Sequence, residues 1–257
     1  MTHNTLRRRT LTAALALTTL AGVAACSSTQ PGQLGQDQQI AAHCPASGKL
    51  ASYVLVDGTG SARSAKIEKI NLQAITRVVR ETAICSGRLT VSGFGSSSGD
   101  AVSIYDGELD ATKPTENATL RAADKLTEQV MQQITAAYDP ALNSLIQSGT
   151  DVNGLLPLIA QQKAQLARYT LHVVLLTDGL TNIDVDPTAA ASTETAKTLA
   201  DLVPVPDLSG VTVTIAGIGR EAVGEIPSTV VANVTAYWER ICERSKATSC
   251  TVVTDWR

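Results

Sequence analysis

Five oxygen-bearing side chains in three separate segments of the chain have the chemistry to bind a hard metal ion. They are hydroxyls and carboxylates, and each lies after a predicted strand or in a loop that faces the strand ends: Asp57, Thr59, Ser61, Thr150 and Asp178. Magnesium takes six oxygen ligands at about 2.0 to 2.1 Å and gives up its water reluctantly, so hydroxyls with a few carboxylates suit it. Such a set supplies two formal negative charges, which leaves a bound Mg²⁺ or Mn²⁺ electrophilic.

The two aspartates follow apolar runs that predict buried strands. Residues 50–56 and 170–177 are nearly continuous apolar stretches, which are typical of parallel strands covered on both faces. Further strands are predicted from alternating or apolar patterns, with 101–105 as an antiparallel edge: residues 89–94, 101–105, 211–216 and 251–254.

Apolar residues at helical spacing predict helices between these strands: residues 65–83, 116–146, 154–168, 193–202 and 229–243. We expect the second helix to break at Asp139-Pro140, because proline removes a backbone donor. Pro157 fits the third helix only in its first turn. Strands that alternate with helices predict an α/β fold, a doubly wound, mainly parallel sheet with helices on both faces, whose strand C-terminal ends carry function.

The order of these elements, together with the five oxygen-bearing residues, resembles the von Willebrand factor A (vWA) family over residues 44–257. The metal-ion-dependent adhesion site (MIDAS) of that family combines the signature Asp-x-Ser-x-Ser with a Thr from a later loop and an Asp that ends a further strand. Here Thr59 replaces the first Ser, and a hydroxyl is retained. The resemblance implies that the three hydroxyls bind Mg²⁺ or Mn²⁺ directly and that the two carboxylates act partly through water. It also implies that the free position takes an exposed Asp or Glu carboxylate of a protein partner.

Each motif taken singly also fits a purely local structural role. Asp57-Gly and Asp178-Gly could be turns in which Asp bonds its own backbone, and Thr150 could belong to the N-cap region of the next helix. A haloacid dehalogenase needs a second Asp where Leu55 stands, and the dinucleotide signature lacks its third glycine. Serine hydrolase chemistry needs a placed His, but His172 lies inside a predicted strand. We therefore expect a binding protein and not an enzyme.

Composition narrows the function further. The net charge of -3 and the pI near 5.6 give no basic field, which disfavours nucleic-acid binding. Two alternatives stay open beside the metal-dependent adhesion domain. The first is a metal-free vWA-like scaffold or assembly lipoprotein, which calorimetry with metal ions would distinguish. The second is a solute-binding lipoprotein, although an aromatic content of 3% leaves few rings for stacking sugars.

The N-terminus has the pattern of an export signal. Three arginines precede an apolar stretch, and the sequence Leu-Ala-Gly-Val-Ala-Ala stands before Cys26. This run resembles the lipobox of bacterial lipoproteins, which implies that Cys26 is lipidated and anchors an extracytoplasmic protein to the cell membrane. We expect residues 1–26 to be a lipoprotein signal peptide, residues 27–43 a flexible tether rich in Gln, Ser and Gly, and residues 44–257 one vWA-like domain.

Four cysteines remain after the signal, an even number that predicts two disulfides in an oxidising compartment: Cys44, Cys85, Cys242 and Cys250. Three pairings are possible. We favour Cys44 with Cys85, because both would lie at the starts of the first two strands, and Cys242 with Cys250, which flank one helix-to-strand turn. The absence of a CxxC pair and the scattered histidines disfavour a zinc site.

Overall fold

A computed structural model of the chain describes residues 32–146, 149–221 and 224–256. The predicted signal peptide, Cys26 included, and residues 27–31 of the predicted tether lie outside the described residues. Within the part of the chain that is described, no helix is long and apolar enough to cross a membrane.

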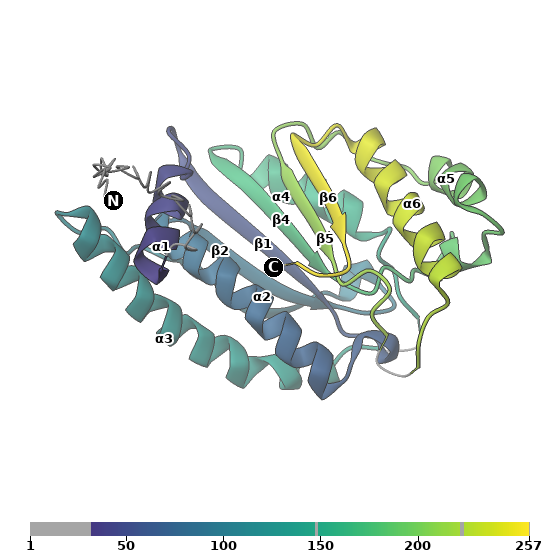
Figure 1. The fold of residues 1–257 in the computed structure, drawn as a ribbon, viewed down its shortest axis with the longest axis horizontal. Coiled ribbons are helices and arrows are strands. Elements are labelled where there is room, and N and C mark those ends of the chain that lie inside the picture. Colours follow the sequence, from purple (N-terminus) through teal and green to yellow (C-terminus); the bar gives the residue numbers. More distant parts are fainter. Residues whose placement is uncertain (1–31, 147–148, 222–223, 257) are drawn as a thin grey trace, which may run out of the picture. The chain divides into compact units, whose positions relative to one another are not determined.

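Six strands form one sheet in the order β3-β2-β1-β4-β5-β6 (Figure 1). Their bounds are β1 (Lys49–Asp57), β2 (Arg88–Phe94), β3 (Val102–Glu108), β4 (Tyr169–Leu176), β5 (Thr212–Ala216) and β6 (Ser249–Val253). β3 runs antiparallel to β2, and every other neighbouring pair is parallel. This arrangement confirms the predicted mainly parallel sheet and its antiparallel edge strand.

Helices cover both faces of the sheet (Figure 1). Their bounds are α1 (Gln33–Ala42), α2 (Ala65–Ile84), α3 (Glu116–Asn143), α4 (Leu155–Gln165), α5 (Thr193–Asp201) and α6 (Ser228–Ser245), with short turns η1 (Gly60–Ala62), η2 (Ser98–Asp100) and η3 (Pro187–Ala189).

An apolar core lies between the sheet and its helices on each face of the sheet. There are two such cores because neighbouring residues of a strand point to opposite faces. Val54 of β1 joins Ile75 of α2 and buried residues of α3 on one face. The next residue, Leu55, joins Trp238 of α6 and buried residues of α4 and α5 on the other face. The doubly wound α/β fold predicted from the sequence is therefore confirmed.

Helix α3 continues through Pro140, so the predicted break at Asp139-Pro140 was wrong. A proline inside a helix costs about 3 kcal/mol, because it removes one hydrogen bond and crowds the preceding turn. On either side of Pro140, Tyr138 and Leu142 bury their side chains in the core. Burying two large side chains contributes enough to offset the cost of the proline.

Residues 33–42 form α1, so the predicted flexible tether is helical over most of its length. Asp37 of this helix is 2% exposed. Its two carboxylate oxygens accept hydrogen bonds from Arg80 of α2 at 2.6 and 2.7 Å, and Arg80 also pairs with Asp124 of α3. A buried ion pair therefore fixes α1 against two helices of the domain.

Both preferred disulfides are present, which confirms the predicted pairing. Cys44 and Cys85 join the segment after α1 to the end of α2. Cys242 and Cys250 join α6 to β6 across a separation of 8 residues. Structural disulfides are typical of proteins that fold outside the cytosol, so the pair indicates an extracytoplasmic or surface protein.

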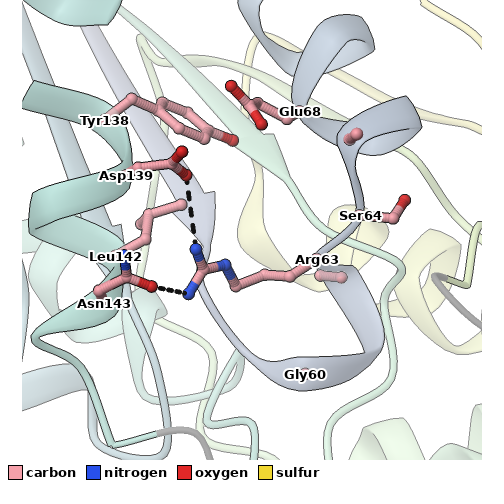
Figure 2. A pocket seen from close by; sticks show the side chains of 10 residues that line it. Gly60, Arg63, Ser64, Glu68, Tyr138, Asp139, Leu142 and Asn143 are labelled. Carbon is pink, nitrogen blue, oxygen red and sulfur yellow. Dashed lines mark hydrogen bonds and ion pairs between the residues drawn. The ribbon is translucent and has the colours of Figure 1, made fainter. Parts of the chain in front are cut away.

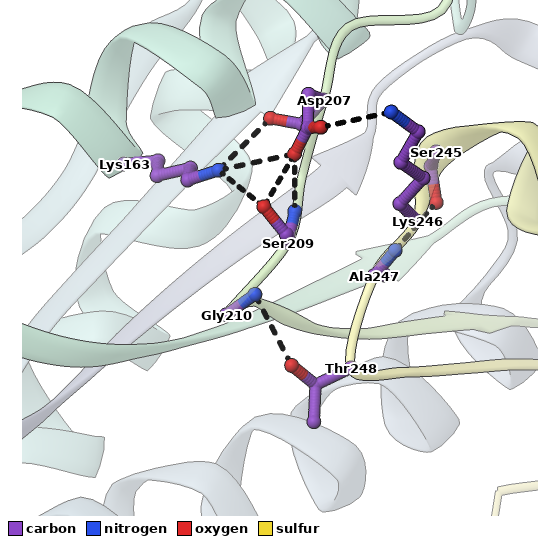
Figure 3. A network of polar contacts seen from close by, with 8 residues as sticks. All are labelled: Lys163, Asp207, Ser209, Gly210, Ser245, Lys246, Ala247 and Thr248. Atoms are coloured by element: carbon purple, nitrogen blue, oxygen red, sulfur yellow. Dashed lines mark hydrogen bonds and ion pairs between the residues drawn. The ribbon is translucent and has the colours of Figure 1, made fainter.

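A polar network joins three elements near the N-terminal ends of β5 and β6 (Figure 3). The Lys163 ammonium donates to the Asp207 carbonyl at 3.0 Å, and the Lys246 ammonium donates to the Asp207 carboxylate at 3.3 Å. The Ser209 hydroxyl and the Ser209 backbone N–H, followed by Lys246, hold the pKa of that carboxyl well below its usual range. The network lies at the edge opposite the residues predicted to bind metal, so we assign it a structural role.

Candidate functional site

The five residues predicted to bind metal lie at one edge of the sheet, where β1 and β4 end side by side. Asp57 is the last residue of β1, and Thr59 and Ser61 follow in the turn that contains η1. Thr150 lies between α3 and α4, and Asp178 comes two residues after β4. All are 4% exposed or less except Ser61, which is half-buried.

Asp57 is fully engaged by hydroxyl and backbone donors. Its Oδ1 accepts the Thr59 N–H at 2.9 Å and the Thr59 hydroxyl at 2.6 Å. Its Oδ2 accepts the Thr177 hydroxyl at 2.7 Å. Burial raises the pKa of Asp57, and these hydrogen bonds lower it in part. The sequence pattern marks Thr177 only as the end of the apolar run 170–177, so this donor is not among the predicted site residues although it stands directly before Asp178.

A chain of hydroxyls connects two of the three segments. The Thr150 hydroxyl donates to Thr59 Oγ1 at 3.1 Å, and Thr59 in turn donates to Asp57. The alternative interpretation of Thr150 as part of a helix N-cap is wrong, because Asp151 accepts the Gly154 N–H at 2.8 Å at the start of α4. The Thr59 and Thr150 oxygens are thus neighbours, and both are ligands of a type that magnesium accepts.

Asp178 is the least satisfied polar group of the site. Its Oδ1 accepts the Leu180 N–H at 2.8 Å. Its Oδ2 is buried and accepts no hydrogen bond from any residue that the structure describes. Burial, and after it the charge of Asp57, raises the pKa of Asp178 to about 7, although the Ser61 hydroxyl lowers it in part. Buried polar groups are normally paired, so this carboxylate has the character of a group that awaits a ligand.

The loop after β5 supports Asp178 from the side of the sheet. The Gly219 N–H donates to the Asp178 carbonyl at 2.9 Å. Gly217 has a φ of +108°, and a Cβ there would lie 2.6 Å from the Thr177 carbonyl oxygen. Only glycine accepts this backbone and this close approach. The tight turn at residues 217–219 therefore keeps Asp178 in place.

Carboxylates alone do not form a metal site here. Within residues 32–146, 149–221 and 224–256, no three or more His, Cys, Asp or Glu side chains gather in a way that could hold a metal ion. A cation at this edge would have two carboxylates, Asp57 and Asp178, and would take its other protein ligands from hydroxyls.

A pocket of about 520 Å³ opens beside the turn that carries Ser61 (Figure 2). Arg63 crosses it from η1 to α3, where the guanidinium donates to Asn143 Oδ1 at 2.8 Å and pairs with Asp139 at 3.5 Å. Glu68 and Tyr138 face each other at the other end of the pocket. Arg63 thus fastens the Ser61 turn to the end of α3.

The sheet order and the antiparallel edge strand define a doubly wound α/β fold, and the five residues converge where β1 and β4 end. The chain matches no known family profile and no curated protein. Solved structures with a similar arrangement include an open conformation of the pilus adhesin SpaC from Lactobacillus rhamnosus GG, at 13% identity, with a TM-score of 0.42 over 83% of this chain and 28% of that chain.

Two other solved structures are similar at the same level. Manganese-loaded TRAP from Plasmodium vivax has 15% identity and a TM-score of 0.41 over 73% of this chain and 63% of that chain. A von Willebrand factor type A protein from Catenulispora acidiphila has 14% identity and a TM-score of 0.34 over 77% of this chain and 42% of that chain. The chain thus spans less than two thirds of each of these proteins.

Proposed function

We propose that this protein is an extracytoplasmic, membrane-anchored vWA-like domain that binds Mg²⁺ or Mn²⁺ at a MIDAS-type site and recognises a protein partner through that ion. The observation that carries the proposal is the buried Asp178 Oδ2, which accepts no hydrogen bond among the described residues. A cation would satisfy this atom and would neutralise two carboxylates whose pKa values are raised by burial.

The residues that would hold the ion are those predicted from the sequence, namely Asp57, Thr59, Ser61, Thr150 and Asp178. The bound ion would supply an electrophilic position for an Asp or Glu carboxylate of the partner. Two carboxylates only balance the charge of a divalent cation, so the site carries no net negative charge that would repel a third carboxylate. The Thr59 hydroxyl already donates its proton to Asp57, so its oxygen can accept a cation while that bond is kept. The role is one of binding and not of catalysis.

Calorimetric titration with Mn²⁺ tests the proposal, and Mn²⁺ is preferred because it binds such oxygen sites more tightly than Mg²⁺. We expect Asp57→Ala to abolish binding. Because Asp57 is buried and its loss can disturb folding, Ser61→Ala serves as the second variant and should weaken Mn²⁺ binding at least about tenfold. Ser103→Ala on the exposed side of β3 is the matched control and should bind as the native protein does. Equal Mn²⁺ affinity in all four proteins would contradict the proposed site.

The metal-free scaffold is a second candidate, and two observations favour it. The bonds from Thr150 to Thr59 and from Thr59 to Asp57 connect the loops without an ion. A cavity of about 10 Å³ also lies beside Asp178, which is close to the space that one water needs, about 10 to 15 Å³. A water there would take the place that the first candidate gives to the ion. A native protein that binds neither Mn²⁺ nor Mg²⁺ in the titration would favour this candidate over the metal-dependent one.

We propose that lipidation of Cys26 provides the membrane anchor. Replacing Cys26 with serine removes the thiol that would carry the lipid, so we expect the protein to move from the detergent-rich to the aqueous phase in Triton X-114 partition of whole cells. Ser27→Ala, next to the same position, should stay in the detergent phase. A Cys26→Ser protein that partitions like the native one would show that another feature holds it at the membrane.

A further inference from the structure

Both main-chain polar groups of Thr150 are bonded to Asn182, and the Thr150 carbonyl is also bonded to Thr181. The Thr150 N–H donates to Asn182 Oδ1 at 2.9 Å. The Thr150 carbonyl accepts the Asn182 N–H and the Thr181 hydroxyl, each at 3.1 Å. Thr150 belongs to no helix or strand. Its position is therefore set by these contacts and not by regular secondary structure.

Thr181 and Asn182 belong to the loop that begins with Asp178, and this loop is well anchored. The Leu180 N–H donates to Asp178 Oδ1 at 2.8 Å, and the indole N–H of Trp238 donates to the Gly179 carbonyl at 2.9 Å. Trp238 is itself fully buried in α6. The loop thus gives Thr150 a fixed point on the side of the site where Asp178 lies.

The other contacts of the Thr150 segment lead to a different place. The Asp151 N–H donates to the Gly95 carbonyl at 3.2 Å, and Asp151 Oδ2 accepts the Ser98 N–H at 3.1 Å. These bonds hold the segment to the chain after β2. They do not reach the Asp178 loop. The Thr150 hydroxyl bonds Thr59 on the β1 side of the site, so residues 181 and 182 make the direct hydrogen bonds between the Thr150 segment and the Asp178 loop.

We propose that Thr181 and Asn182 are positioning residues that clamp the Thr150 loop onto the Asp178 loop and so preassemble the cation site that both loops share. This inference rests on the proposed function. Two features separate it from ordinary packing. The Thr181 hydroxyl is 0% exposed and donates to the Thr150 carbonyl. Asn182 is exposed, so burial of its side chain does not account for its contact with Thr150.

The clamp is tested by hydrogen exchange at the Thr150 amide, followed by NMR, together with Mn²⁺ calorimetry. Asn182→Ala removes the acceptor of that amide, so we expect its exchange to be at least about tenfold faster and Mn²⁺ binding to be about tenfold weaker, as is usual when a group that orients a metal ligand is lost. Thr181→Val should weaken Mn²⁺ binding in the same way. Thr181→Ser keeps the hydroxyl and should restore both native values.

Asn117→Ala, an exposed asparagine in the first turn of α3, is the matched control and should leave both readouts unchanged. Native Thr150 exchange and native Mn²⁺ affinity in Asn182→Ala would overturn the clamp while the metal site stands. Absence of Mn²⁺ binding by the native protein would end the proposed function, and the exchange rate alone would then decide the clamp. Faster exchange in Asn182→Ala but not in Asn117→Ala would support it, and equal exchange would refute it.

Discussion

Replacing Asp178 with asparagine should stabilise the protein above about pH 7 when no metal is present. The same substitution should abolish the stabilisation that added Mn²⁺ gives to the native protein. The pKa of the folded Asp178 is about 7, against 3.8 for the ordinary carboxyl, and burial is the largest cause. The folded state therefore binds more protons than the unfolded state between these two values. The contribution of this group to stability is fully present below about pH 4 and is lost as the pH rises to about 7.

The size of this effect makes it measurable. One pKa unit corresponds to about 1.4 kcal/mol, so ionising Asp178 costs the metal-free fold at most about 4 kcal/mol. Asparagine has nearly the same shape and does not ionise, so this cost disappears in the variant. Mn²⁺ present at about 100 times its Kd should stabilise the native protein by about 2.7 kcal/mol and should leave Asp178→Asn unchanged.

Urea unfolding at pH 5.0 and pH 7.5, in EDTA and in MnCl₂, measures both halves of this prediction. Asp184→Asn makes the same substitution at an exposed position and should keep the native pH dependence and the native response to Mn²⁺. If the native protein and Asp178→Asn lose the same free energy of unfolding between the two pH values in EDTA, Asp178 does not carry the buried charge. If Mn²⁺ stabilises Asp178→Asn, Asp178 is not needed for the ion.

The parts of the site that the sequence predicts are those fixed by local pattern. Asp57 and Asp178 each follow a nearly continuous apolar run, and such runs are buried parallel strands in this fold. Parallel strands present their C-terminal ends at one edge, so the two carboxylates had to share that edge. The family resemblance predicts that Thr150 lies at the same edge as the two carboxylates. In the structure, the hydrogen bond from the Thr150 hydroxyl to Thr59 holds Thr150 at that edge.

The parts that the sequence does not predict depend on partners far along the chain. Thr177 donates to a carboxylate 120 residues away, and Asn182 accepts the backbone N–H of a residue 32 positions before it. Neither contact produces a periodic pattern in the sequence from which it could be predicted. Pro140 is a strong local breaker, and the burial of its neighbours in α3 overrides it. In each case tertiary contacts decide against the local preference.

Helix α1 is the clearest case in which a tertiary contact overrides the local sequence. Its buried ion pair leads to a second prediction, a large loss in the free energy of unfolding. The composition of residues 33–42 is that of a tether, because the helix has little apolar surface to bury. What fixes it is Asp37, whose carboxylate is 3% exposed and lies against Arg80. Arg80→Met should leave this buried carboxylate without its main partner and lower the free energy of unfolding by about 3 to 5 kcal/mol.

The double variant Asp37→Leu with Arg80→Met separates the charge from the packing. Replacing both members of a buried ion pair with apolar residues is often neutral, so the double variant should recover most of the stability that Arg80→Met loses. Arg240→Met is the control, since Arg240 pairs with Asp201 and Glu243 in an exposed network and its loss should change the unfolding midpoint little. Urea unfolding of the four proteins at pH 7 gives the comparison. An Arg80→Met midpoint equal to that of Arg240→Met would mean that α1 is not held by the buried pair, and residues 33–42 would then act as the tether that their composition predicts.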